Sequence, residues 1–181
     1  GLGWVSRMDS RIFSGQPDQP PHHSGPVRCV TIDVEEYFHI EAARGVVGRD
    51  QWDRWPSRVE RNVDLLLSLL QNHNRRGTFF VLGDVAKKHP GLARRVAEAG
   101  HEIASHGWRW IDYNGMPKEE ERDHLRRAVA AIEQACGQRP VGWYTGRVSA
   151  NTRDIVVEEG GFLYDSDTYD DDLPYWVEVQ S

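Results

Sequence analysis

Two short stretches of the sequence carry side chains whose types and spacing suit hydrolytic chemistry. The first stretch, "TIDVEEYFH", contains Asp33 and Glu35, two residues apart. In an extended strand such residues point to the same face, so the two carboxylates would lie side by side. Paired carboxylates repel each other, which raises one pKa or attracts a cation, and both effects serve catalysis. The alternative is a solvated turn. Glu36 faces the opposite way and is interpreted as structural.

The second stretch, "GHEIASHGWRW", places His106 between Ser105 and Gly107. Metal sites often use two histidines four residues apart, but here the second position holds Trp110. A histidine can bind a metal or move a proton, and the glycine allows another backbone to approach closely. The alternative for His106 is a hydrogen-bonded loop residue. Trp108 and Trp110 suit either core packing or stacking against a sugar ring.

Apolar patterning predicts the elements that must position these residues. Strands are predicted over residues 27–33, 78–83, 101–105, 141–145 and 162–167, and helices over 57–74, 90–100, 117–137 and 149–161. Ser57 and Ser149 are predicted N-caps, and Gly100 and Gly137 are predicted to follow helix ends. Steady alternation of strand and helix is typical of a parallel sheet or a (β/α) barrel, so the predicted fold class is α/β.

In such folds the catalytic residues collect at the carboxyl ends of the strands. Titratable or polar residues follow each predicted strand: Asp33, Glu35, Asp84, His106, Tyr144, Arg147, Asp165 and Asp167. We therefore expect one polar rim that contains the active site. An inert protein also has a polar surface, and Arg147 in particular suits either a carboxylate partner or a surface position.

Composition limits the class of protein. A length of 181 residues, with 39% hydrophobic and 28% charged residues, fits one soluble domain. The net charge of −6 argues against nucleic acid or an anionic membrane as a partner. No apolar run reaches the length of a membrane span, so a cytoplasmic location is predicted. Residues 1–26 are predicted to be a disordered or extended tail, with one domain over 27–181. Cys29 and Cys136 are predicted to be reduced core residues.

Three segments, "TIDVEEYFHIEA", "SRVERNVDLLLSLL" and "RGTFFVLGDVAKKHPGLARRVAEAGHEIASHG", resemble the NodB-type polysaccharide deacetylases, particularly the branch found at exopolysaccharide loci. The resemblance implies a distorted (β/α) barrel that hydrolyses N-acetyl groups of sugars with a divalent metal such as zinc. By this likeness Asp33 is the catalytic base, and Glu35 and His106 are metal ligands. Trp110 stands where the family has a second histidine. Since catalytic zinc usually has three protein ligands, weak or absent metal binding is expected.

The later segments, "SHGWRWIDYNGMPKEEERDHLRRA" and "RPVGWYTGRVSANTRDIVVEEGGFLYDSDTYDDDLPYW", are similar to the allantoinases built on the same fold. Those enzymes hydrolyse a cyclic amide, are thought to need no metal, and also carry a tryptophan at the position of Trp110. By this likeness Asp33 or Glu35 positions water together with His106. Arg147 then neutralises developing charge, and Trp110 closes the site.

The combined set of candidates is Asp33 and Arg147 as catalytic residues, Glu35 and His106 as metal ligands, and Trp108, Trp110 and Tyr144 as substrate-binding residues. Hydrolysis of a non-peptide carbon–nitrogen bond, most directly de-N-acetylation of a polysaccharide or amino sugar, is the predicted function. An allantoinase-type hydrolase and an inactive carbohydrate-binding remnant, which would stack sugars on Trp108, Trp110 and Trp143, are the alternatives. The resemblance also implies later β/α units with an L-x-H strand, so we expect an incomplete barrel at the C-terminus. The oligomeric state is left open.

Overall fold

The strands form one curved sheet. In the computed structural model, which describes residues 3–5, 29–169, 174–177 and 179, the strand order is β2-β3-β4-β5-β6-β1-β7. The strands are β1 (Gly3–Val5), β2 (Thr31–Val34), β3 (Thr78–Val81), β4 (Glu102–Ser105), β5 (Gly142–Trp143), β6 (Tyr164–Asp165) and β7 (Tyr175–Val177). Strands β2 to β6 are parallel, and β1 is antiparallel to β6. The five parallel strands are those predicted from the sequence, and they lie in the sheet in the order in which they follow along the chain.

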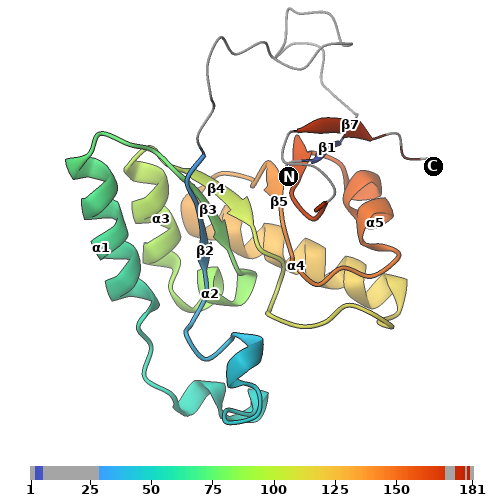
Figure 1. Cartoon of the computed structure of the whole chain (residues 1–181), viewed down its shortest axis with the longest axis horizontal. Helices are drawn as coiled ribbons and strands as arrows, with labels where there is room; N and C mark the ends of the chain where they lie inside the picture. Colours follow the sequence, from blue (N-terminus) through green and yellow to red (C-terminus); the bar gives the residue numbers. More distant parts are fainter. Residues whose placement is uncertain (1–2, 6–28, 170–173, 178, 180–181) are drawn as a thin grey trace, which may run out of the picture.

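Helices connect the parallel strands and cover one side of the sheet, with α4 running behind the strands in the view of Figure 1. The helices are α1 (Val59–Asn72), α2 (Gly83–Lys88), α3 (Pro90–Glu98), α4 (Lys118–Cys136) and α5 (Thr152–Glu159), with short 3-10 helices η1 (Glu41–Ala43) and η2 (Arg49–Arg54). The four predicted helices are present, each shorter than predicted. The predictions missed α2, whose six residues are too few to show a helical apolar period.

The main core lies between this side of the sheet and the helices. It contains Val34, Val81, Leu92, Val96 and Ile132, all almost fully buried. Gly83 lets α2 approach α4 closely, because a Cβ there would lie 2.7 Å from the Cα of Ala128. The same Cβ would lie 2.7 Å from the Trp108 ring. A side chain at this position would therefore push the two helices apart.

The start of α1 differs from the prediction. The N-cap is Arg58, without a side-chain cap from its own segment. Instead, the buried carboxylate of Glu36 accepts hydrogen bonds from the Arg58 N–H, at 3.0 Å, and from the Ser57 hydroxyl. A carboxylate at this place also complements the positive end of the helix dipole. Ser57 is thus not the cap, and Glu36 has the structural role predicted for it.

The sheet does not close into a barrel within the described residues, since β2 and β7 are its two outer strands. The predicted α/β class with an open barrel-type sheet is therefore confirmed. Gly3–Val5 pair as β1 within the range predicted to be a disordered or extended tail, and the other residues of 1–26 lie outside the described part. Cys29 and Cys136 are free thiols, but Cys29 is exposed and so was wrongly placed in the core. No described helix is long and apolar enough to span a bilayer.

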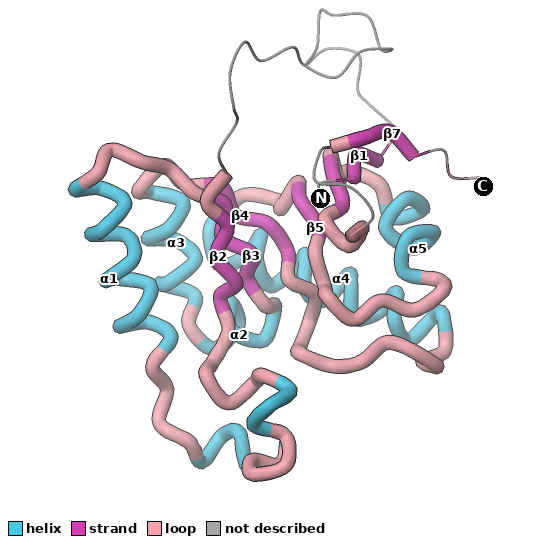
Figure 2. Tube along the Cα trace, in the orientation of Figure 1, coloured by secondary structure: helices cyan, strands magenta, loops and turns pink. Residues whose placement is uncertain are grey.

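A small lobe, residues 35–58, extends from the carboxyl end of β2. Figure 2 shows its two short helices below the strands. The lobe has its own core of Phe38, Val47 and Trp52, against which Trp110 packs. Trp110 also packs against the main core, so it joins the lobe to the rest of the fold.

Candidate active site

The carboxyl ends of three strands bring the central candidates together. Asp33 lies in β2 with its side chain exposed, and Glu35 follows directly after that strand. His106 follows β4, and its Nε2 lies 3.8 Å from Oε2 of Glu35. Tyr144 follows β5, with its ring stacked on that of His106 at a centroid distance of 5.1 Å. Residues from distant parts of the sequence thus form one cluster.

His106 has a fixed orientation and a bare ring nitrogen. Its side chain is 3% exposed, and its Nδ1 lies 2.9 Å from the carbonyl oxygen of Tyr144. Because a carbonyl can only accept, Nδ1 carries the proton. Burial lowers the pKa of His106, against smaller raising effects of the Asp33 charge and the Tyr144 bond, and so favours the neutral ring. In that form Nε2 has a free lone pair, and it receives no hydrogen bond from the described residues.

Glu35 faces this nitrogen. Burial, and then the nearby charge of Asp33, raises the pKa of Glu35 to about 7. Its Oε2 is buried and has no hydrogen-bond partner among the described residues. At 3.8 Å the two atoms are too far apart for a direct hydrogen bond. Because Oε2 of Glu35 and Nε2 of His106 are both buried and without a partner, a water oxygen or a cation that contacts both atoms would satisfy them.

The cluster does not complete a metal site by itself. No group of three His, Cys, Asp or Glu side chains within the described residues is arranged to hold a metal ion. Glu35 and His106 offer two ligands, whereas catalytic zinc usually has three from the protein. Trp110, at the fourth residue after His106, supplies none. The residues present therefore do not fit a tightly bound metal.

Trp110 and Arg147, from the loops that follow His106 and Tyr144, stack on each other. The Arg147 guanidinium carbon lies 5.0 Å from the centre of the Trp110 ring, a cation–π contact between the loops after β5 and β4. Trp108 lies elsewhere: its side chain is 5% exposed, and Arg127 covers its ring at 4.3 Å. The structure thus places Trp108 in packing rather than at the site. Trp143 is equally buried, so neither ring is available to stack on a sugar.

A group of aromatic rings, Phe80, Tyr144 and Tyr164, packs next to Asp33 on the inner face of the sheet. Phe80 is the register partner of Asp33 in the neighbouring strand, so both side chains are on the inner face of the sheet. The Phe80 ring contacts Tyr144 at 5.5 Å and Tyr164 at 6.5 Å between centroids. The Tyr164 hydroxyl in turn donates to Glu102 at 2.9 Å. These aromatic rings pack against one another on the inner face of the sheet, whereas the Asp33 side chain stays exposed to solvent.

Asp165 and Asp167 belong to the polar rim predicted at the strand ends, but no role was predicted for either residue. In the structure Oδ1 of Asp167 accepts the backbone N–H groups of Gly146, at 2.7 Å, and of Thr145, at 3.0 Å. Burial, and then the charge of Asp165, raises the pKa of Asp167 to about 7. The available signal was the pattern "DSD" directly after a predicted strand.

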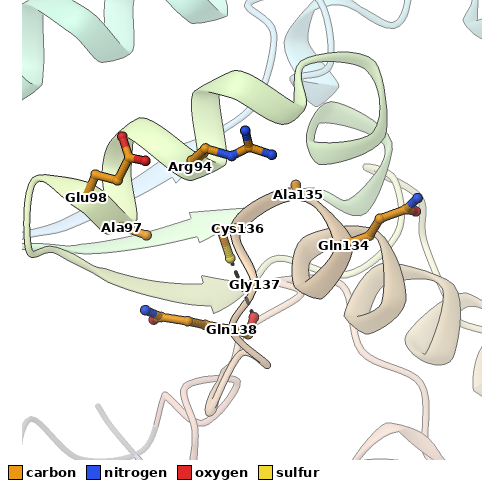
Figure 3. A pocket seen from close by; sticks show the side chains of 8 residues that line it. All are labelled: Arg94, Ala97, Glu98, Gln134, Ala135, Cys136, Gly137 and Gln138. Atoms are coloured by element: carbon orange, nitrogen blue, oxygen red, sulfur yellow. Dashed lines mark hydrogen bonds between the residues drawn. The ribbon is translucent and has the colours of Figure 1, made fainter.

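A surface groove between α3 and α4 is unrelated to this cluster (Figure 3). It is lined by Arg94, Ala97, Glu98, Gln134, Ala135, Cys136, Gly137 and Gln138. These residues lie at the ends of helices that lead into β4 and β5, so the groove is at the opposite end of the sheet from the strand carboxyl ends. The Cys136 thiol in this groove donates to the carbonyl oxygens of Ile132 and Gln138.

The sequence matches the family model described as polysaccharide deacetylase over residues 51–160, more than half of the chain. It is also 40% identical over 119 residues to a Schizosaccharomyces pombe protein whose name assigns it to the polysaccharide deacetylases. That match covers 62% of this chain and 37% of the relative. A peptidoglycan deacetylase of Helicobacter pylori is 26% identical over 150 residues, 77% of this chain and 51% of the relative. The chain therefore spans a third to a half of these relatives.

Among the solved structures that resemble this fold, two match the two likenesses noted in the sequence. One, from Pseudomonas aeruginosa PAO1, is described as a probable polysaccharide deacetylase. It is 51% identical with a TM-score of 0.63, and the match covers 66% of this chain and 40% of that one. The other, the PuuE allantoinase, is 34% identical with a TM-score of 0.66 over 88% of this chain and 64% of that one. Both likenesses noted in the sequence thus recur in three dimensions.

Proposed function

The chain belongs to the polysaccharide deacetylase family, and from this membership we propose that it hydrolyses a non-peptide carbon–nitrogen bond, removing N-acetyl groups from a polysaccharide or amino sugar. The observation that carries the proposal is the buried pair of Glu35 Oε2 and His106 Nε2, unpartnered and 3.8 Å apart beside Asp33. Unsatisfied buried polar atoms are costly to keep, so such a pair indicates a functional site.

Amide hydrolysis needs an activated water, charge stabilisation at the carbonyl oxygen and a proton for the leaving nitrogen. Asp33 is the group open to solvent at the strand end, so it takes the proton from the attacking water. His106, with Nδ1 held by Tyr144, directs its free Nε2 toward that water. Glu35, whose pKa is about 7, exchanges a proton near neutral pH and can return one to the leaving nitrogen.

On the substrate side we propose Trp110 and Tyr144 as contacts. Both are half-buried and lie on the loops after β4 and β5. The Tyr144 ring stacks on His106, and Trp110 follows His106 by four residues. A sugar ring packs well on an aromatic face, and Arg147, stacked on Trp110, brings a positive charge to the same side. Trp108 is left out of this set because it is buried under Arg127.

We also propose that Glu35 and His106 act as ligands that bind a divalent cation such as zinc weakly. No step above depends on it, because the third ligand of a tight site is absent from the described residues.

A second candidate is an allantoinase-type hydrolase acting without metal. The supporting observation is Trp110, which replaces a second histidine and is held under Arg147. The broad match to the PuuE allantoinase agrees with it.

The test measures acetate release from N-acetylglucosamine oligomers and ring-opening of allantoin by the purified full chain, each in chelator and with added zinc. Acetate release supports the first proposal, and turnover of allantoin in chelator supports the second. Absence of both activities, together with sugar binding, would contradict both and leave the inactive carbohydrate-binding protein.

A further inference from the structure

The loop after β5 determines how His106 is held. Tyr144 places its ring against the imidazole and its carbonyl oxygen 2.9 Å from Nδ1. Gly146 has a φ of +73°, so the chain reverses there through a left-handed conformation. Arg147 follows and reaches the Trp110 ring. The position of this turn therefore fixes groups on two sides of the site.

One carboxylate oxygen holds the turn in place. Oδ1 of Asp167 accepts the N–H of Gly146 at 2.7 Å and that of Thr145 at 3.0 Å. The second oxygen, Oδ2, lies 3.1 Å from the Thr145 nitrogen. Successive backbone N–H groups in a turn of this kind form a concave site for an anion, and here the chain fills it with its own side chain.

Hydrogen bonds of the backbone N–H groups of Ser166 and Asp167 hold the segment that carries Asp167. The buried Asp165 accepts the backbone N–H of Asp167 through its Oδ1 at 2.9 Å. The N–H of Ser166 donates to the carbonyl oxygen of Trp143 at 2.8 Å, which ties the segment to β5. The path from β6 to the imidazole thus consists of hydrogen bonds of 2.7 to 3.0 Å followed by one short turn.

We propose that Asp167, supported by Asp165, is a positioning residue for His106. It acts through the Thr145–Gly146 turn and the Tyr144 carbonyl, which together keep the imidazole in the Nδ1-protonated tautomer with Nε2 toward Glu35. The expected effect of Asp167 on turnover rests on the proposed function, whereas its expected effect on the His106 tautomer does not.

Three variants separate position from charge. Asp167→Asn keeps an Oδ1 that can accept both N–H groups but removes the charge. Asp167→Glu keeps the charge but moves the carboxylate by about one C–C bond, about 1.5 Å. Asp167→Ala removes both. Thr168→Ala is the matched control on the same segment, because the Thr168 hydroxyl accepts a hydrogen bond from the exposed Arg153 side chain, at 2.9 Å, away from the turn.

The first readout is the tautomer of His106, followed by ¹⁵N NMR of the imidazole in the full chain and assigned with His106→Gln. We expect the Nδ1-protonated form in the wild type, Asp167→Asn and Thr168→Ala. We expect a mixture of tautomers in Asp167→Glu and in Asp167→Ala. If Asp167→Ala does not fold, Asp167→Glu and Asp167→Asn still decide the matter.

The second readout is steady-state turnover. A misplaced catalytic group lowers the rate of reaction more than binding, so kcat should fall about tenfold or more in Asp167→Glu and Asp167→Ala with little change in KM. Asp167→Asn should restore kcat to near the wild-type value. An unchanged tautomer in folded Asp167→Glu overturns the proposal, as does an Asp167→Asn protein as impaired as Asp167→Glu. A tautomer change without turnover in any protein would support the positioning role and count against the proposed activity.

Discussion

Alanine substitutions at the adjacent residues Glu35 and Glu36 should have very different effects on stability. The Glu36 side chain is 5% exposed, and its two oxygens accept hydrogen bonds from the Ser57 hydroxyl and from the Arg58 N–H at the start of α1. A hydrogen bond to a charged group contributes about 1.5–3 kcal/mol, so loss of the two bonds in Glu36→Ala should lower the free energy of unfolding by about 3–6 kcal/mol. Glu35→Ala removes an oxygen, Oε2, that has no hydrogen-bond partner, so its effect should stay within about 1 kcal/mol.

Urea unfolding followed by tryptophan fluorescence measures both effects. With an m-value of about 2–3 kcal/mol/M, the midpoint for Glu36→Ala should fall by about 1–3 M, whereas that for Glu35→Ala should stay close to the wild type. Glu36→Gln is the graded control. Its amide keeps an acceptor for Arg58 and a partner for Ser57 but loses the charge, so its midpoint should lie between the two. Equal midpoints for the two alanine variants would refute the assignment of Glu36 to the helix start and of Glu35 to the site.

Three further predictions follow. The pKa of Asp167 in the folded chain, about 7, lies above the ordinary aspartate value, so the stability linked to its proton is present near pH 4 and lost as pH rises to 7. Asp167→Asn should remove this decline, measured as free energies of unfolding at pH 4.5 and 7.5; an identical pH profile in the variant would contradict it. Gly83→Ala should lower stability by about 1–3 kcal/mol in thermal unfolding, because its Cβ meets the backbone of Ala128, and an unchanged melting temperature would count against that contact. Zinc titration by calorimetry should show weak binding that His106→Gln abolishes; tight binding retained in that variant would place the metal elsewhere.

The order of the strands and helices could be predicted because burial imposes a period on the sequence. Residues such as Val81 and Phe79 are apolar for the same physical reason that they face the core. The meeting of Glu35 and His106 also followed, since parallel strands place their carboxyl ends at one edge of the sheet. The ends of elements were less accessible. Ser57 has the right type for a cap, but a carboxylate from another segment occupies that role.

Side-chain surroundings were harder to predict. Trp108 and Trp110 are two residues apart in the same loop, yet one is covered by Arg127 and the other stacks with Arg147. No pattern within the loop distinguishes them, because the covering residues come from elements far away in the sequence. The same holds for Asp167, whose partners are backbone N–H groups more than twenty residues earlier. Backbone donors carry no sequence signal.

The role of Asp33 as the base is tested most directly by the rate of acetate release from N-acetylglucosamine oligomers, measured for the wild-type chain and for Asp33→Asn. Urea unfolding of both proteins should first show that their midpoints are equal. Asp33 is exposed at the end of β2 and lies outside the core, so the variant should fold as the wild type does. Loss of a general base costs about 10²- to 10⁴-fold in rate, so the rate of acetate release by Asp33→Asn should fall by about 10²-fold or more. Equal rates of acetate release in the two proteins would contradict the role of Asp33 as the base.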